Sequence, residues 1–264
     1  MIDLYQVDAF AEEVFTGNPA AVCPLQRWLP DELLQNIAME NNLSETAFYV
    51  MSGDHYHIRW FTPAVEVELC GHATLAAAWV LFNFEGHKED EITFFSALSG
   101  ILKVKREGDL LTMDFPADTV KEVPCAEEVA VCFSPQPSEV HRGRSDYLLL
   151  FDNEDDIAAL SPSMAELSTI DARGIIVTAQ GREADFVSRF FAPRVGVDED
   201  PVTGSAHTSL APFWAGRLGK TEMTARQLSK RGGEIKCRHL GDRVEISGTA
   251  RLYMKGELPG LACN

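Results

Sequence analysis

The sequence is short of positive charge, and this shortage excludes two kinds of partner. It holds 40 acidic residues against 23 basic ones, which gives a formal net charge of -17 at pH 7. A surface of this kind repels the phosphates of nucleic acids and of anionic membranes. We therefore expect neither nucleic acid nor membrane among its partners.

Long apolar runs and clustered metal ligands are also missing. No stretch approaches the ~20 apolar residues needed to cross a bilayer, and the chain begins with MIDLYQVD, which lacks the basic start and apolar core of a secretion signal. The six cysteines show no CxxC spacing, and no HxxxH or HExxH sequence occurs. These absences predict a cytoplasmic protein with free thiols and no metal site.

The chain contains a partial copy of itself. Residues 59–70 and 189–200 align without a gap, and 71–79 then align with 206–214 with His, Leu, Ala and Trp in register. Five positions of the first stretch are identical, namely Arg59/Arg189, Phe61/Phe191, Pro63/Pro193, Val65/Val195 and Val67/Val197. Two strand-loop-helix units can look alike by chance, but the shared Arg, Pro, His and Trp favour a duplication.

Both copies predict the same local structure, in which a strand ends near Phe-x-Pro and a loop leads to a helix that is apolar almost all round. Such a helix belongs in a core. Further strands are predicted at 4–10, 46–51, 91–95, 101–106, 111–115, 147–151, 174–178 and 243–247. We expect an α+β fold of two pseudo-symmetric halves, each an antiparallel sheet or barrel wrapped around a central helix. The proline-bounded segment 116–124 places the halves at 1–117 and 118–264.

Small polar residues precede both of these helices, as CGHAT at 70–74 and TGSAH at 203–207. The N–H groups of a first helical turn bind anions, and the glycines, Gly71 and Gly204, let a ligand approach the backbone. If the halves face each other, both helix starts would meet in one cleft suited to a substrate carboxylate or an enolate-like charge. Ordinary helix capping is the alternative for either segment by itself.

Several side chains around these segments can handle protons. Cys70 and His72 lie at the first helix start, with a buried inert thiol and a structural histidine as the alternatives. Glu45 lies where a polar loop enters an apolar strand, and Asp200 lies in an acidic run; each is a general acid or base, or a solvated carboxylate. In the repeat, Cys70 aligns with Asp200 or, across an insertion, with Ser205, so the second thiol of a two-base racemase is missing.

Six short segments resemble, in order, those of the PhzF-like family of phenazine biosynthesis proteins. They are VDAF at 7–10, FTGNPA at 15–20, LSETAF at 43–48, RWFTP at 59–63, GHAT at 71–74 and DPVTGSA at 200–206. Each segment is weak by itself, but six in order over nearly the whole chain are specific. The resemblance implies a diaminopimelate-epimerase-like fold, a homodimer, an active site between the halves and no cofactor.

The resemblance also implies particular site residues. The catalytic residues would be Glu45, which shuttles a proton, with His72 and Asp200. The residues that bind substrate would be Asn18, Cys70, Gly71, Gly204 and Ser205.

The predicted function is that of a cofactor-independent isomerase, which moves a proton on a small anionic molecule by general acid/base catalysis. One alternative is a racemase or epimerase of an amino or imino acid that uses Cys70. Another is a binding protein without turnover on the same fold. A hydrolase is not expected, because no GxSxG sequence is present.

Overall fold

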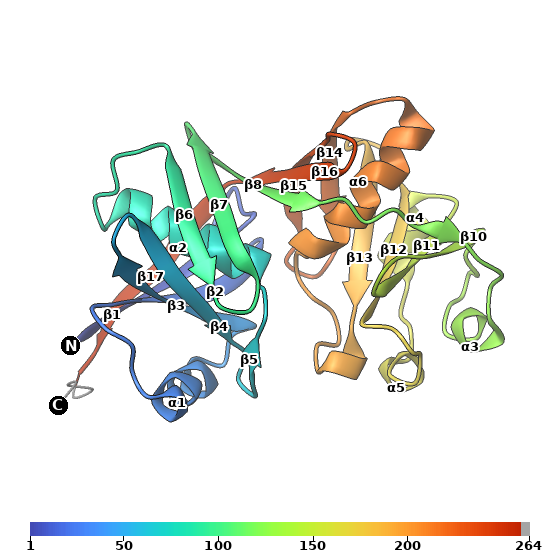
Figure 1. Cartoon of the computed structure of the whole chain (residues 1–264). Coiled ribbons are helices and arrows are strands. Elements are labelled where there is room, and N and C mark those ends of the chain that lie inside the picture. Colours follow the sequence, from blue (N-terminus) through green and yellow to red (C-terminus); the bar gives the residue numbers. More distant parts are fainter. Residues whose placement is uncertain (260–264) are drawn as a thin grey trace. The chain divides into compact units, whose positions relative to one another are not determined.

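The computed structural model describes residues 1–259 of the chain, so Cys263 lies outside the described residues (Figure 1). The chain divides into two compact units, one formed by Met1–Asp114 with the chain from Ser247 on, the other by Phe115–Ile246. The predicted second half, 118–264, is therefore too long. Its last strand, β17 (Ala250–Leu258), pairs antiparallel with β1 (Ile2–Ala9) and so belongs to the first unit.

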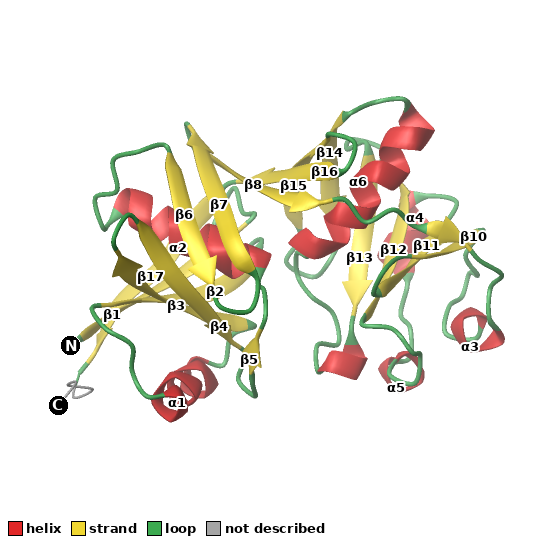
Figure 2. Cartoon of the chain, viewed as in Figure 1, coloured by secondary structure: helices red, strands yellow, loops and turns green. Residues whose placement is uncertain are grey.

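Each unit is mainly β-sheet with few helices (Figure 2). The first unit adds to β1 and β17 the elements β2 (Asn18–Leu25), α1 (Asp31–Asn41), β3 (Glu45–Ser52), β4 (His55–Phe61), β5 (Glu66–Val67), α2 (Gly71–Asn83), β6 (Glu91–Ser96), β7 (Gly100–Glu107) and β8 (Leu110–Pro116). The second holds β9 (Lys121–Glu122), α3 (Glu127–Ala130), β10 (Glu139–Arg142), β11 (Asp146–Leu150), α4 (Glu154–Ala159), α5 (Met164–Leu167), β12 (Gly174–Gln180), β13 (Phe186–Phe191), η1 (Pro193–Val195), α6 (Gly204–Leu218), β14 (Glu222–Gln227), β15 (Gly233–His239) and β16 (Arg243–Gly248).

The two units repeat one order of strand pairings. In the first unit, β1–β2 is antiparallel, β2–β3 parallel, β3–β4 antiparallel, β4–β6 parallel and β6–β7 antiparallel. In the second, the pairs β10–β11, β11–β12, β12–β13, β13–β14 and β14–β15 follow the same sequence of directions. The predicted duplication is confirmed, and each sheet adds parallel pairs to the antiparallel pairs that were predicted. Each parallel pair is joined by a crossover that contains a helix, as parallel pairing requires.

The two arginines of the repeat make similar contacts, although their glutamate partners stand at different positions of the alignment. The Nε of Arg59 donates to Oε1 of Glu66 at 2.7 Å, and the Nε of Arg189 donates to Oε1 of Glu199 at 2.7 Å. Each guanidinium also lies over the ring of the phenylalanine two residues further on, at 5.1 and 4.8 Å from the ring centroid. The identical residues of the two copies therefore keep one local arrangement.

The two long apolar helices are the cores of their units, as predicted. In α2, all seven residues of 72–78 are buried, and in α6 eight residues are buried, including Leu210 and Trp214. Their many alanines let strands approach on several sides. Within residues 1–259, no helix is long and apolar enough to cross a membrane.

Candidate active site

Four polar side chains of the first unit meet where three of its elements begin. Asn18 is the first residue of β2, Glu45 is the first of β3, and Cys70 and His72 flank the first residue of α2. Because β2 and β3 pair in parallel, with Ala20 opposite Glu45, their starts lie at one sheet edge. Neighbouring elements thus bring together residues that lie far apart in the sequence.

Local sequence explains how α1 and α2 deliver Glu45 and His72 to this edge. Helix α1 begins after a proline, carries two acidic residues in its first turn and ends at Asn42, which adopts the left-handed conformation that stops a helix. Three residues later the chain enters β3 at Glu45. Before α2, Cys70 is still extended, and Gly71 opens the helix.

The hydrogen bonds of His72 assign its tautomer. The side-chain amide nitrogen of Asn18 lies 3.2 Å from Nδ1 of His72, and Nε2 of His72 lies 3.2 Å from Oε2 of Glu45. An amide nitrogen can only donate, so Nδ1 accepts and the ring proton sits on Nε2. The N–H of His72 therefore faces the carboxylate of Glu45 in a close contact that lacks the geometry of a hydrogen bond.

Burial keeps this imidazole neutral. His72 is 6% exposed, and loss of water around the ring lowers its pKa to about 3. The side chain of Glu45, at 17% exposed, is more open than that of His72, at 7%. The carboxylate is thus the group of this pair better placed to touch a ligand.

Cys70 completes the cluster. Its Sγ lies 3.4 Å from Nδ1 of His72, and ligand atoms of Glu45, Cys70 and His72 lie within 4.8 Å of one another, which is a spacing that a bound metal ion also needs. The side chains of Glu45, Cys70 and His72 are also of types that transfer protons.

In the second unit, buried hydrogen bonds fix the loop that precedes α6. The hydroxyl of Thr203 donates to Oδ2 of Asp200 at 2.5 Å. The amide of Gln227, a fully buried residue at the end of β14, accepts from the N–H of Thr203 at 2.9 Å and donates to the carbonyl of Asp200 at 2.7 Å. Asp200 and the start of α6 are thus held in one arrangement.

Ser205, in the first turn of α6, is oriented by an ion pair. The guanidinium of Arg173 donates from Nε to the buried carboxylate of Asp146 at 2.9 Å and from Nη1 to Oγ of Ser205 at 3.1 Å. The carboxylate of Asp146 raises the pKa of Arg173, although burial opposes this. Because a guanidinium only donates, the hydroxyl of Ser205 accepts here and keeps its own proton to donate elsewhere.

The structure thus gathers the predicted site residues into two groups, one in each unit. The first group contains Asn18, Glu45, Cys70, Gly71 and His72, and the second contains Asp200, Gly204 and Ser205. Sequence reasoning missed Arg173 and Gln227, which stand in no motif, because strand register alone brings them to the start of α6.

The residues that directly precede α2 and α6 are Cys70 and Thr203. Neither Cys70 nor Thr203 caps its helix through a side chain, among the residues that the structure describes. Ordinary capping therefore does not account for these two segments.

Comparison with known proteins identifies the family of this chain. The phenazine biosynthesis-like protein family (PhzC-PhzF) matches residues 7–256. Two curated proteins of Pseudomonas aeruginosa, both named as uncharacterized isomerases, are 55% and 51% identical, each covering 97% of this chain and 98% of its own length. The crystal structure of a PhzF-family phenazine biosynthesis protein from Enterococcus faecalis is 46% identical and has a TM-score of 0.95, over 97% of this chain and 98% of that one.

More distant structures share the fold alone. A hydroxyproline epimerase from Agrobacterium vitis has a TM-score of 0.62 at 9% identity, over 97% of this chain and 91% of that one. The predicted epimerase-like fold and the predicted family are confirmed. The chain therefore belongs to the phenazine biosynthesis-like (PhzC-PhzF) family, and it is an isomerase of that family.

Proposed function

We propose that this isomerase moves a proton on a small carboxylate-bearing molecule, without a cofactor, and that Glu45 carries the proton. The observation that supports this role is the contact at 3.2 Å between the carboxylate of Glu45 and the neutral, buried imidazole of His72. The contact holds the carboxylate in one orientation, while its partial exposure leaves it able to meet a substrate. Orientation and access are what a general base needs.

The proposed reaction has two proton transfers. The carboxylate of Glu45 removes a proton from a carbon next to a carboxylate or a conjugated system, and the electron pair of the C–H bond delocalises into that system. The protonated Glu45 then gives the proton to another carbon of the same molecule and returns to its ionised form. During this cycle the N–H of His72 would donate to the carboxylate of Glu45 and so stabilise its charged form.

The remaining predicted residues have proposed roles in binding. N–H groups in the first turns of α2 and α6 would hold a substrate carboxylate, since no side chain of Cys70 or Thr203 occupies them in the described residues. Gly71 and Gly204 would allow its close approach. Asp200 and Ser205 would bind the polar substituents of the substrate.

Deuterium incorporation from heavy water tests the role of Glu45. The protein is incubated with a pool of small carboxylic and amino acids, and uptake of deuterium is followed by mass spectrometry. Wild type should exchange, and Glu45→Gln should lose at least about 100-fold in rate, because loss of a general base costs 10²–10⁴. Glu40→Gln, on the exposed surface of α1, is the matched control and should exchange like wild type. A Glu45→Gln protein that exchanges at the wild-type rate would refute the proposal.

A racemase or epimerase that uses Cys70 is the second candidate, because Sγ of Cys70 lies 3.4 Å from Nδ1 of His72, a path for a thiol proton. Cys70→Ser distinguishes the two, with Cys132→Ser, another buried thiol, as control. If Glu45 carries the proton, Cys70→Ser keeps most of the exchange. Loss of exchange in Cys70→Ser, together with its survival in Glu45→Gln, would instead establish the thiol mechanism.

A further inference from the structure

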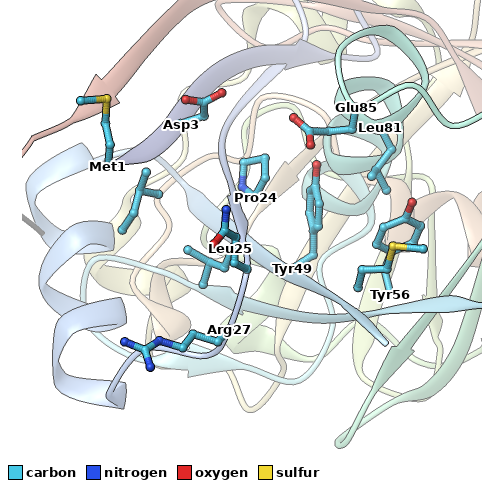
Figure 3. Close-up of a pocket in the computed structure, with 12 residues that line it drawn as sticks. Met1, Asp3, Pro24, Leu25, Arg27, Tyr49, Tyr56, Leu81 and Glu85 are labelled. Carbon is cyan, nitrogen blue, oxygen red and sulfur yellow. The ribbon is translucent and has the colours of Figure 1, made fainter. Parts of the chain in front are cut away.

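The first unit has a second concave site, away from the cluster around Glu45. A pocket of about 890 Å³ lies at the opposite ends of the same elements (Figure 3). It is lined by Pro24 near the end of β2, which begins at Asn18, and by Leu81 near the end of α2, which begins beside His72. Six residues of strand separate Asn18 from Pro24, which is roughly 20 Å. The pocket is therefore distinct from the candidate active site.

A buried hydroxyl in this pocket has no partner. Tyr49 is 3% exposed, and among the described residues nothing forms a hydrogen bond with its hydroxyl. Figure 3 shows that this hydroxyl points toward the side of the pocket where Glu85 lies. Burial and the nearby charge of Glu85 raise the pKa of Tyr49 well above its usual value, so the group stays an un-ionised phenol. A buried phenol without a partner is destabilising, and a ligand that bonded to it would remove that cost.

The carboxylate of Glu85 lacks a counter-ion. No ion pair involves it within residues 1–259, and its hydrogen-bond partner there is the hydroxyl of Tyr5 at 3.5 Å. Burial raises the pKa of the phenols of Tyr49 and Tyr56, and the negative charge of Glu85 raises it further. One unpaired carboxylate and two tyrosine side chains thus line this side of the pocket. Arg27 lies across the pocket from Glu85 (Figure 3), so this side remains acidic.

The chain itself shows that an ammonium group suits these surroundings. Nζ of Lys255 lies 5.0 Å from the ring centroid of Tyr5 and 5.5 Å from that of Phe84, within the range of a cation–π contact. It also lies 3.7 Å from the carboxylate of Asp3. Lys255 therefore forms its ion pair with Asp3, and the carboxylate of Glu85 in the pocket remains available to another cation.

We propose that this pocket binds a primary ammonium group attached to an apolar body. The ammonium would donate to the carboxylate of Glu85 and to the hydroxyl oxygen of Tyr49. The body would lie on apolar lining such as Leu25 and Leu81. A cation is favoured over a neutral or anionic ligand because Glu85 is unpaired and the whole chain has a net charge of -17.

Benzylamine is the probe, and benzyl alcohol, which has the same shape without the charge, is its control. Binding is measured by calorimetry and by ligand-observed NMR. Benzylamine should bind at least about tenfold more tightly than benzyl alcohol, and Glu85→Gln should weaken benzylamine by about tenfold or more, because a charge-assisted hydrogen bond is lost. Tyr49→Phe should weaken it several-fold. Glu89→Gln, which removes a neighbouring exposed carboxylate, should leave binding unchanged.

Glu45→Gln separates this pocket from the candidate active site. Since Glu45 does not line the pocket, this variant should bind benzylamine as wild type does. The proposal is overturned if benzyl alcohol binds equally well, if Glu85→Gln binds benzylamine unchanged, or if Glu45→Gln abolishes binding. Glu85 is exposed, so Glu85→Gln should fold as wild type does. Its unfolding temperature, compared with that of Glu89→Gln, shows whether the substitution has caused a folding defect.

Discussion

A single amide decides which nitrogen of His72 carries the proton. Asn18 donates to Nδ1, so Nε2 carries the proton and lies 3.2 Å from the carboxylate of Glu45, and burial lowers the pKa of the ring to about 3. In nitrogen-detected NMR, we expect His72 as the neutral Nε2–H tautomer, without titration between pH 8 and pH 5. A ring that titrates near pH 6.5, or one that carries its proton on Nδ1, would contradict the assigned hydrogen bonds.

Arg173 is the clearest test of a residue that orients the site from outside it. Its substitution by glutamine would leave Asp146, which is 4% exposed, as a buried carboxylate without its cation. The side chain of Arg173 is itself 40% exposed, so we expect a loss of about 1–3 kcal/mol in the free energy of unfolding, the cost of leaving a buried acceptor without its partner. Arg182→Gln breaks the exposed pair with Asp155 and should change stability too little to measure in the same urea titration. If Arg173→Gln and Arg182→Gln lowered the free energy of unfolding equally, the burial of Asp146 would not contribute to the cost of losing its partner.

Tyr49→Phe should raise the free energy of unfolding, whereas Arg173→Gln should lower it. Because the hydroxyl of Tyr49 is buried without a partner in the described residues, its removal should raise the free energy of unfolding by about 1 kcal/mol in the absence of ligand. Chemical denaturation checks this, and Tyr253→Phe, at an exposed tyrosine, is the control expected to have no effect. A destabilised Tyr49→Phe protein would mean that the hydroxyl contributes a favourable interaction after all.

At this scale, sequence reasoning could identify residues that stand in local motifs. Glu45 and His72 stand in short recognisable segments, and the structure brings them into contact. Arg173 and Gln227 carry no such signal. Their partners, Asp146 and Thr203, are separated from them in sequence by 27 and 24 residues, and only the pairing of strands brings them together.

At the scale of elements, α6 shows how a residue unsuited to a helix is accommodated. Pro212 lies inside the helix and cannot donate to the carbonyl of Thr208. The backbone N–H of Asp118 donates to that carbonyl instead, at 3.0 Å, and the carboxylate of Asp118 accepts from the hydroxyl of Ser209. The segment after the predicted join thus completes the hydrogen bonds of the central helix of the second unit.

Two glycines of the second unit should respond oppositely to alanine. A Cβ at Gly174, the first residue of β12, would lie 2.2 Å from the ring of Phe190, so the paired strands β12 and β13 would have to shift. Gly216 lies on the exposed side of α6 with open space around it. Gly174→Ala should lower the free energy of unfolding by about 1–3 kcal/mol, and Gly216→Ala should raise it by about 0.5–1 kcal/mol. If thermal and urea unfolding showed that Gly174→Ala and Gly216→Ala change stability in the same direction, the packing of Phe190 against Gly174 would be contradicted.

The predicted strands at 4–10, 46–51 and 174–178 correspond to β1, β3 and β12, but their directions could not be predicted. Alternation of apolar residues is the same for a parallel and an antiparallel strand, and β12 is buried almost throughout, so it shows no alternation. The connection between two strands decides whether they pair parallel or antiparallel. The connection between β2 and β3 contains α1 and returns the chain to the end of the sheet where β2 began, so β3 starts with Glu45 near Asn18.

At the scale of the whole molecule, sequence reasoning found the duplication but assigned the last strand, β17, to the second unit and not to the first. The repeat covers only the central segments of each half, so it gave no information on β17. That strand follows the second copy in sequence but pairs along all of β1, from Ile2 opposite Leu258 to Ala9 opposite Ala250. The first unit therefore cannot complete its sheet until the end of the chain has been made.

Two histidines whose pKa burial lowers, one in each unit, should make the stability of the whole protein depend on pH. Burial lowers the pKa of His72 to about 3 and that of His207 to about 4, against about 6.5 in an unfolded chain. Between these values the unfolded state binds more protons than the folded state, so stability is fully present above about pH 6.5 and is lost as the pH falls. Each histidine should contribute a slope approaching about 1.4 kcal/mol per pH unit between pH 6 and pH 5.

Urea unfolding at pH 7, 6 and 5 measures this slope, and His207→Asn should remove about half of it. The asparagine amide can replace Nδ1 of His207 as donor to the carbonyl of Thr203, a bond of 2.8 Å, so the change removes the titrating group more than the contact. Carboxyls with a lowered pKa, such as Asp185 beside Lys220, lose their contribution only below about pH 4. A flat profile in wild type, or an unchanged slope in His207→Asn, would show that the histidines are not held neutral by the cores of the two units.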